Sequence, residues 1–135
     1  MAEFVDVFDL SRHPLKLQPS GASNFRHGFA SFVKYFPEGK AVTAQIEEQF
    51  WKEVAAQDSG YPVIFDDQYI STGGQFFELL TGHDRMVVDL RPLTMKRAGI
   101  TQALMCHPYD FCTALILEEA GILLESPLGG PFCSI

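Results

Sequence analysis

The chain has no long apolar run, little positive charge and few cysteines. No stretch approaches the roughly 18 consecutive apolar residues of a transmembrane helix, so we expect no membrane association. Ten Lys and Arg stand against 17 Asp and Glu, and the net charge of −7 disfavours a nucleic-acid binder because it repels phosphate. Three cysteines without paired spacing argue against a disulfide framework, and the first residues lack the apolar core and cleavage site of a signal peptide. The sequence therefore predicts a cytoplasmic protein whose acidic surface tolerates a bound cation.

The composition predicts a folded domain. Hydrophobic residues make up 47% of the 135 positions, including twelve Phe, which is enough to bury a core. Residues 11–24 are rich in turn formers. We expect a single domain over 1–135, with a loop-rich N-terminal segment at 1–28 and an α/β core at 29–135.

Strands and helices are expected to alternate along this core. Ile46, Phe50 and Val54 recur at helical spacing, with Thr43 in position to be the N-cap. Pattern and turn residues predict strands at 29–37, 63–65, 85–90 and 122–126, helices at 43–57, 75–82 and 107–121, and a polar connection at 91–102. This order is typical of a layered α/β architecture in which helices cover a parallel or mixed sheet.

Two helix openings are candidate binding sites, because ligands in such folds lie beyond the carboxyl ends of the strands. Ser71, Thr72, Gly73 and Gly74 open the helix that Gly82 ends. Their backbone N–H groups would suit an anion such as phosphate, although an N-cap followed by a turn explains the same residues. No lysine follows as in a P-loop.

The second opening contains Asp110, two residues after Pro108. A carboxylate in the first helical turn interacts favourably with the helix dipole, and proline suits the first position. The other interpretation is a ligand for Mg²⁺, which prefers oxygen donors. Among the other acids, Asp66 is expected to be a solvated loop residue, and His83 is expected to interact with a helix C-terminus.

Three segments together resemble the C-terminal half of the inositol monophosphatase family. They read STGGQFFELLTGHDRMVVDL from Ser71, HPYDFCTALILEEAGILLES from His107 and PLGGPF from Pro127. Asp110 falls on the aspartate of the family's Trp-Asp pair, with Tyr109 in place of the tryptophan, and the Glu-Ala-Gly that ends at Gly121 matches the same helix. The chain departs from the family at Ile122, where a second glycine is usual, and at Ala103, where an acid is usual.

The resemblance implies a Mg²⁺-dependent phosphatase, a hydrolase that acts on a small phosphorylated polyol or sugar. It assigns Asp110 to the metal and Ser71, Thr72, Gly73 and Gly74 to the substrate. Because the family's N-terminal acidic ligands have no counterpart here, the chain is expected to be the C-terminal portion of such an enzyme. Alone it is then expected to be nearly inactive and to need an N-terminal companion. The alternative is a non-catalytic module acting through dimerisation, with an interface formed by Phe25, Phe29, Phe32 and Phe36.

Overall fold

A three-stranded parallel sheet lies at the centre of the structure, a computed structural model that describes residues 3–57, 64–66, 71–100 and 113–132. The strand order is β4 (Ile64–Phe65), β3 (Gly28–Phe32), β5 (Asp84–Val88). The α/β class and the parallel sheet predicted from the sequence are confirmed. The closer likeness to the sugar-phosphatase fold stays a prediction.

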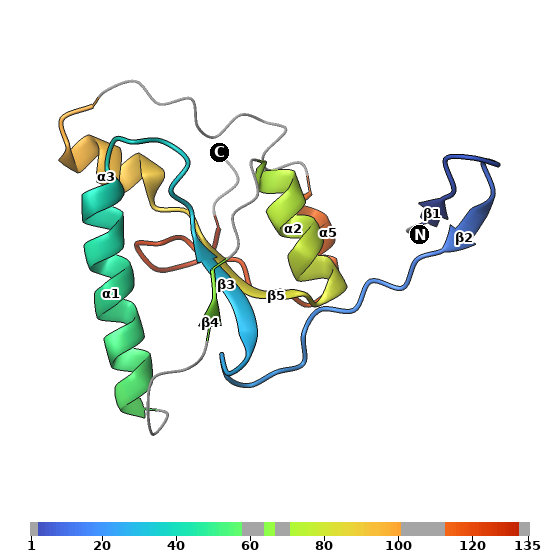
Figure 1. The fold of residues 1–135 in the computed structure, drawn as a ribbon, viewed down its shortest axis with the longest axis horizontal. Helices are drawn as coiled ribbons and strands as arrows, with labels where there is room; N and C mark the ends of the chain where they lie inside the picture. The colour runs from blue at the N-terminus through green and yellow to red at the C-terminus, as the bar shows by residue number, and fades with distance from the viewer. Residues whose placement is uncertain (1–2, 58–63, 67–70, 101–112, 133–135) are drawn as a thin grey trace.

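Helices cover both faces of this sheet (Figure 1). Helix α1 (Lys40–Gln57) connects β3 to β4, and α2 (Thr72–Thr81) connects β4 to β5 across the central strand. Since these two crossovers run in opposite directions, right-handed connections require the two helices to lie on opposite faces. Helix α3 (Arg91–Arg97) contacts α1, and α5 (Ala114–Glu119) contacts α2. No helix in the described ranges is long and apolar enough to cross a membrane.

The side chains of β3 alternate between the two helical layers, as the pleat requires. Phe32, 2% exposed, packs edge-on against Phe50 of α1 at 5.6 Å between ring centroids. On the other face, Ser31 accepts a hydrogen bond from Gln75 of α2. The central strand therefore fixes the position of both helices.

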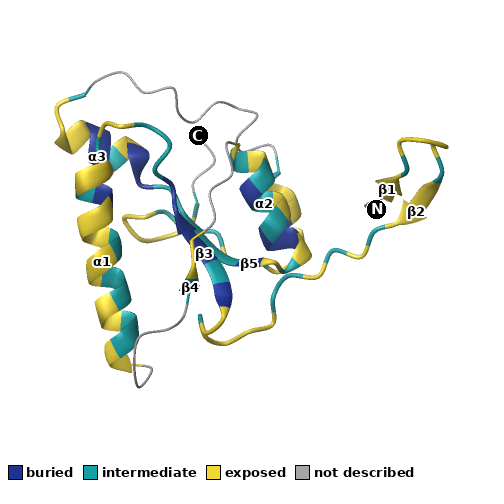
Figure 2. Ribbon diagram, viewed as in Figure 1, coloured by how far each residue is buried: buried dark blue, intermediate teal, exposed yellow. Residues whose placement is uncertain are grey.

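The best-buried apolar cluster joins α2 and α5. Leu79 and Leu80 of α2 pack with Leu117 of α5, whose side chain is fully buried. Figure 2 shows the buried residues of α2 in dark blue. Burying one leucine contributes about 1.5–3 kcal/mol. Because α5 has only six residues, this contact with α2 is what holds it in place.

Each of the phenylalanines predicted to form an interface makes a ring contact within the chain, and one of them is fully buried. Phe25 lies against Trp51 at 5.4 Å, Phe32 is buried, and Phe29 stacks on His83. The ring of Phe36 lies under the Arg91 guanidinium. Phe32 is therefore not available to a partner, and an interface that uses the other three stays a prediction.

Several predicted element boundaries also need correction. Helix α1 begins at Lys40, so Thr43 is an interior, buried residue and not the N-cap, while Ile46 is 40% exposed. The supposed polar connection at 91–102 contains helix α3, with Pro92 in its first turn. The predicted strand at 122–126 is reduced to one bridge, between Glu125 and Pro131.

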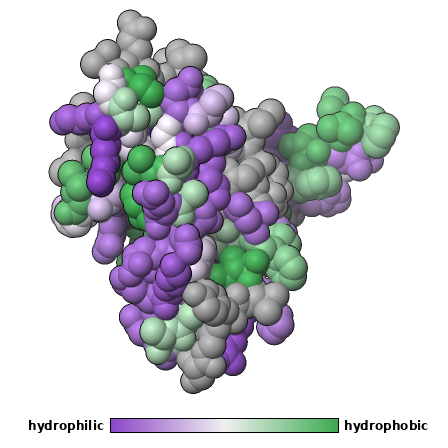
Figure 3. Space-filling view, turned by 60° about the vertical axis from the view of Figure 1, so that its left-hand side comes forward, coloured by the Kyte–Doolittle hydropathy of each residue, from purple (hydrophilic) through white to green (hydrophobic). Residues whose placement is uncertain are grey.

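The N-terminal segment is not merely loop-rich, because β1 (Glu3–Val5) and β2 (Arg12–Pro14) form an antiparallel hairpin. The hairpin projects away from the helices and the sheet in Figure 1. Its apolar side chains are exposed and appear green at the right of Figure 3: Phe4, Val5, Val7, Phe8 and Leu10. An isolated two-stranded hairpin is marginally stable in water.

Candidate functional site

The opening of α2 has the geometry of a capped helix N-terminus. Ser71 has extended backbone angles, φ −134° and ψ 142°, and its Oγ accepts a hydrogen bond from the Gly74 N–H at 3.1 Å. No bond within the helix reaches the N–H groups of Thr72 and Gly73, because they belong to the first turn. A Cβ placed on Gly73 would meet nothing within 4 Å. Among the described residues, none therefore stands in the way of a ligand that approaches Gly73.

A buried amide anchors this turn to the sheet. Gln75 is 1% exposed, and its Nε2 donates to Ser31 Oγ at 3.4 Å. Its Oε1 is buried and has no hydrogen-bond partner among the described residues. Gln75 thus fixes the helix opening relative to the central strand.

A lysine and two carboxylates gather where β3 and β4 end. Lys34 Nζ lies 2.6 Å from Glu47 Oε2 of α1 and 3.4 Å from Asp66 Oδ2, which follows β4. Partial burial lowers the pKa of Lys34, but the Glu47 hydrogen bond and the charges of Asp66 and Glu47 outweigh it, so the pKa is raised. Asp66 is therefore an ion-pair partner and not the purely solvated acid expected from the sequence.

A second ion pair lies where β5 ends. The Arg91 side chain donates to Asp89 through Nε and Nη2, with Nη2 to Oδ2 at 2.6 Å. Its guanidinium carbon is 5.1 Å from the centroid of the Tyr35 ring, in the segment that follows β3. Helix α3, which follows β5, contacts α1, which follows β3, so both connections run on the same side of the sheet. The Arg91 guanidinium is held there between Asp89 and the Tyr35 ring.

The structure brings the predicted substrate residues together. Ser71, Thr72, Gly73 and Gly74 form the opening of α2, which follows β4 as predicted. That they contact a substrate stays a prediction. Asp110 lies outside the described residues, so its role as a metal ligand stays a prediction. Helix α5, which begins at Ala114, packs against α2.

Sequence reasoning missed the polar groups that only the fold assembles. Lys34 and Asp89 each lie within two residues after a strand, and the rule that ligands bind at strand ends could have drawn attention to them. One group of potential metal ligands occurs among the described residues, and it consists of Glu78, His83 and Asp84. It lies at the opposite end of α2 from Ser71. In the sequence, Gly82 could have pointed to this group. A left-handed glycine after a helix turns the chain back over the last helical turn, which brings His83 close to Glu78.

Comparison with known proteins gives no match to any family model, curated protein or solved structure.

Proposed function

We propose that this chain is the C-terminal portion of a Mg²⁺-dependent phosphomonoesterase that acts on a small phosphorylated polyol or sugar. In this proposal the turn at Ser71, Thr72, Gly73 and Gly74 contacts the substrate, and Asp110 contributes one carboxylate to the metal. The proposal combines the sequence resemblance with the placement of the α2 opening.

The observation that carries the proposal is the open, capped N-terminus of α2 beyond the carboxyl end of a parallel sheet. The Ser71 cap satisfies the Gly74 N–H and leaves the amides of Thr72 and Gly73 pointing out of the first turn. The positive end of the helix dipole lies here and favours an anion. Because Gly73 has no side chain and open space around it, a phosphorylated ligand can approach the backbone closely.

The described residues fit the anion-binding part of this site better than the metal-binding part. Glu47 and Asp66 are oxygen donors near the carboxyl end of the sheet, but both face the Lys34 ammonium. The metal part therefore depends on Asp110 and on ligands from an N-terminal companion. Mg²⁺ in such enzymes activates a water and stabilises the leaving oxygen. One carboxylate does not build a two-metal site, so we expect very slow phosphate release by residues 1–135 alone.

A binding experiment tests the proposal without requiring turnover. Inositol 1-phosphate is titrated into the ¹⁵N-labelled chain with and without Mg²⁺, and backbone amide shifts are followed by NMR. We expect the largest shifts at Thr72 and Gly73, and tighter binding with Mg²⁺. Asp110→Asn should remove the effect of Mg²⁺ while leaving the weaker, metal-free binding.

A matched control is Asp9→Asn, which removes one exposed carboxylate from the N-terminal hairpin. It should behave as the unaltered chain does. Shifts that avoid the α2 opening would contradict the role of the turn. A Mg²⁺ effect that survives Asp110→Asn would contradict the role of the aspartate, and fast phosphate release by the chain alone would contradict the need for a companion.

A second candidate function is self-association through the hairpin. Its most exposed apolar side chain, Phe8, is 95% exposed, and Val7 is 80% exposed. Such side chains gathered on one projecting element favour a protein interface. Sedimentation of the chain should then show a dimer that Phe8→Glu dissociates, whereas Leu128→Glu, at a residue 79% exposed and far along the chain, should not. A monomeric unaltered chain would exclude this function.

A further inference from the structure

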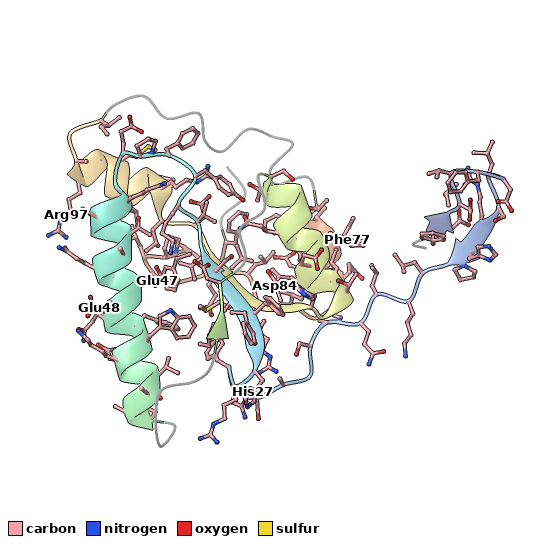
Figure 4. All side chains as sticks on the ribbon, in the orientation of Figure 1. His27, Glu47, Glu48, Phe77, Asp84 and Arg97 are labelled. Carbon is pink, nitrogen blue, oxygen red and sulfur yellow. The ribbon has the colours of Figure 1, made fainter. Side chains whose placement is uncertain are left out.

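Three potential metal ligands meet where α2 ends and β5 begins. His83 Nδ1 lies 2.9 Å from Asp84 Oδ1 and 3.2 Å from Glu78 Oε2. One ligand atom from each residue lies within 4.8 Å of the other two. The group includes Asp84, which is 1% exposed and is labelled in Figure 4 at the start of β5.

The backbone holds these side chains in place through a glycine-terminated helix end. Gly82 adopts φ 80°, and its N–H bonds to the Leu79 carbonyl, while the His83 N–H bonds to the Glu78 carbonyl at 3.0 Å. This pair of bonds is the Schellman motif, and it folds residue 83 back over residue 78. Asp84 is fixed separately by its pairing with Phe29 in the sheet.

A ring contact also orients the imidazole of His83. The Phe29 ring stacks on His83 with 4.2 Å between centroids and 24° between planes. This contact limits rotation of the imidazole and keeps Nδ1 directed at the two carboxylates. The donor atoms are thus preorganised, which lowers the cost of binding an ion.

The chemistry of the three donors favours a cation over a shared proton. Nδ1 carries at most one hydrogen, yet two carboxylate oxygens lie within hydrogen-bonding distance of it. The negative end of the α2 dipole lies here and adds to the attraction for a cation.

The donor set indicates which kind of ion. Mg²⁺ and Ca²⁺ prefer oxygen ligands alone, whereas Zn²⁺ accepts one imidazole nitrogen with carboxylates. Tetrahedral Zn²⁺ with bonds of 2.0–2.1 Å places its ligand atoms roughly 3.3 Å apart, close to the 2.9 and 3.2 Å observed here. His83 is 41% exposed on its side chain, which leaves room for water in the fourth position.

We propose that Glu78, His83 and Asp84 bind one transition-metal ion of the Zn²⁺ type. This site is separate from the proposed phosphatase site, because Ser71 and His83 lie on either side of the ten residues of α2, a helix length of about 15 Å. It needs neither Asp110 nor a companion segment.

Calorimetric titration of the whole chain with Zn²⁺ tests the proposal. We expect one ion per chain, and His83→Gln and Glu78→Gln should each weaken binding more than about tenfold, since losing even an outer partner of a ligand costs 10–100-fold. His13→Gln is the matched control, because His13 lies in the exposed strand β2, and it should bind as the unaltered chain does. Circular dichroism checks that each variant is folded.

A parallel titration with Co²⁺ identifies the donor type, because thiolate ligands produce an intense near-ultraviolet band that nitrogen and oxygen ligands lack. No such band is expected. Its appearance would assign the ion to the cysteines and overturn the proposal. Failure of the unaltered chain to bind Zn²⁺, or unchanged affinity in His83→Gln or Glu78→Gln, would also overturn it and leave a hydrogen-bonded cluster.

Discussion

Replacing Gly82 with alanine should destabilise the protein, whereas the same replacement at Gly73 should stabilise it. Gly82 ends α2 with φ 80°, and a Cβ there would lie 2.6 Å from the Gln18 carbonyl oxygen. Gly73 lies in the first turn of α2, and its Cβ would meet nothing within 4 Å. The same substitution is thus made at a crowded position and at an uncrowded position of one helix.

The cost at Gly82 has two parts. A left-handed conformation costs an L-residue about 1–2 kcal/mol. The contact with Gln18 is with backbone, so the N-terminal segment must move, which disturbs the hydrogen bond from the Gln18 N–H to the Leu80 carbonyl. A hydrogen bond of this kind contributes about 0.5–1.5 kcal/mol. Gly82→Ala should therefore lower the free energy of unfolding by about 1.5–3.5 kcal/mol.

At Gly73, alanine restricts the unfolded chain and favours the helix, which stabilises by about 0.5–1 kcal/mol. Urea unfolding followed by fluorescence measures both effects, because Trp51 is the single tryptophan and packs against Phe25 and Phe50. The midpoints should shift in opposite directions with similar slopes. A Gly82→Ala protein as stable as the unaltered chain would refute the account of this helix end.

Three further changes test the packing and the ion pairs. Glu47→Gln should lower the free energy of unfolding by about 1–3 kcal/mol, because it removes the carboxylate charge that accepts the Lys34 hydrogen bond. Glu48→Gln, on the solvent side of α1 in Figure 4, should have no measurable effect in the same urea assay. Leu117→Ala should cost about 2–5 kcal/mol in thermal or urea unfolding, since the residue is fully buried. The raised pKa of Lys34 means that its ion pair stabilises fully below pH 10.5 and is lost as pH rises through the raised pKa. The stability difference between the unaltered chain and Lys34→Met should accordingly stay constant below pH 10.5 and shrink as the pH rises above it, and a difference that does not shrink there would contradict this assignment.

The sequence predicted α2 well because its ends are set by local chemistry. Ser71 caps the helix through its own side chain, and Gly82 ends it through its own backbone freedom. Neither the Ser71 cap nor the Gly82 helix end depends on distant residues, so both can be predicted from a short stretch of sequence. The predicted class of a parallel α/β fold followed from such alternating segments.

Helix α1 was less predictable because tertiary contacts decide which face is buried. The apolar spacing placed Ile46 inward, but Thr43 and Glu47 occupy the face toward the sheet, and Ile46 is 40% exposed. Glu47 is drawn inward by Lys34, a residue from another element. Phe50 and Val54 are half-buried as the spacing predicted, so only Ile46 lies outside the face toward the sheet. Local sequence contains no sign that Lys34 is the partner of Glu47.

Helix α3 was missed for a similar reason. Its sequence is polar and contains Pro92, so a connection without a helix was predicted there. In the structure, Thr94 and Met95 are buried and Arg91 is 8% exposed. Arg91 becomes a core residue because Asp89 and the Tyr35 ring satisfy its charge. A charged residue is buried only where such partners exist, and those partners are assembled by the fold.

The two proposed sites follow from the electrostatics of a single helix. The amino end of α2 carries partial positive charge and bears Ser71 and open amides, which suit phosphate. Its carboxyl end carries partial negative charge and bears Glu78 with His83 folded back over it, which suits a metal ion. Because Gln75 and Leu79 hold the helix against β3 and α5, each end keeps its direction relative to the sheet. Sites this far apart with no shared partner are expected to act additively, so removing His83 should leave phosphate binding at the amino end unchanged.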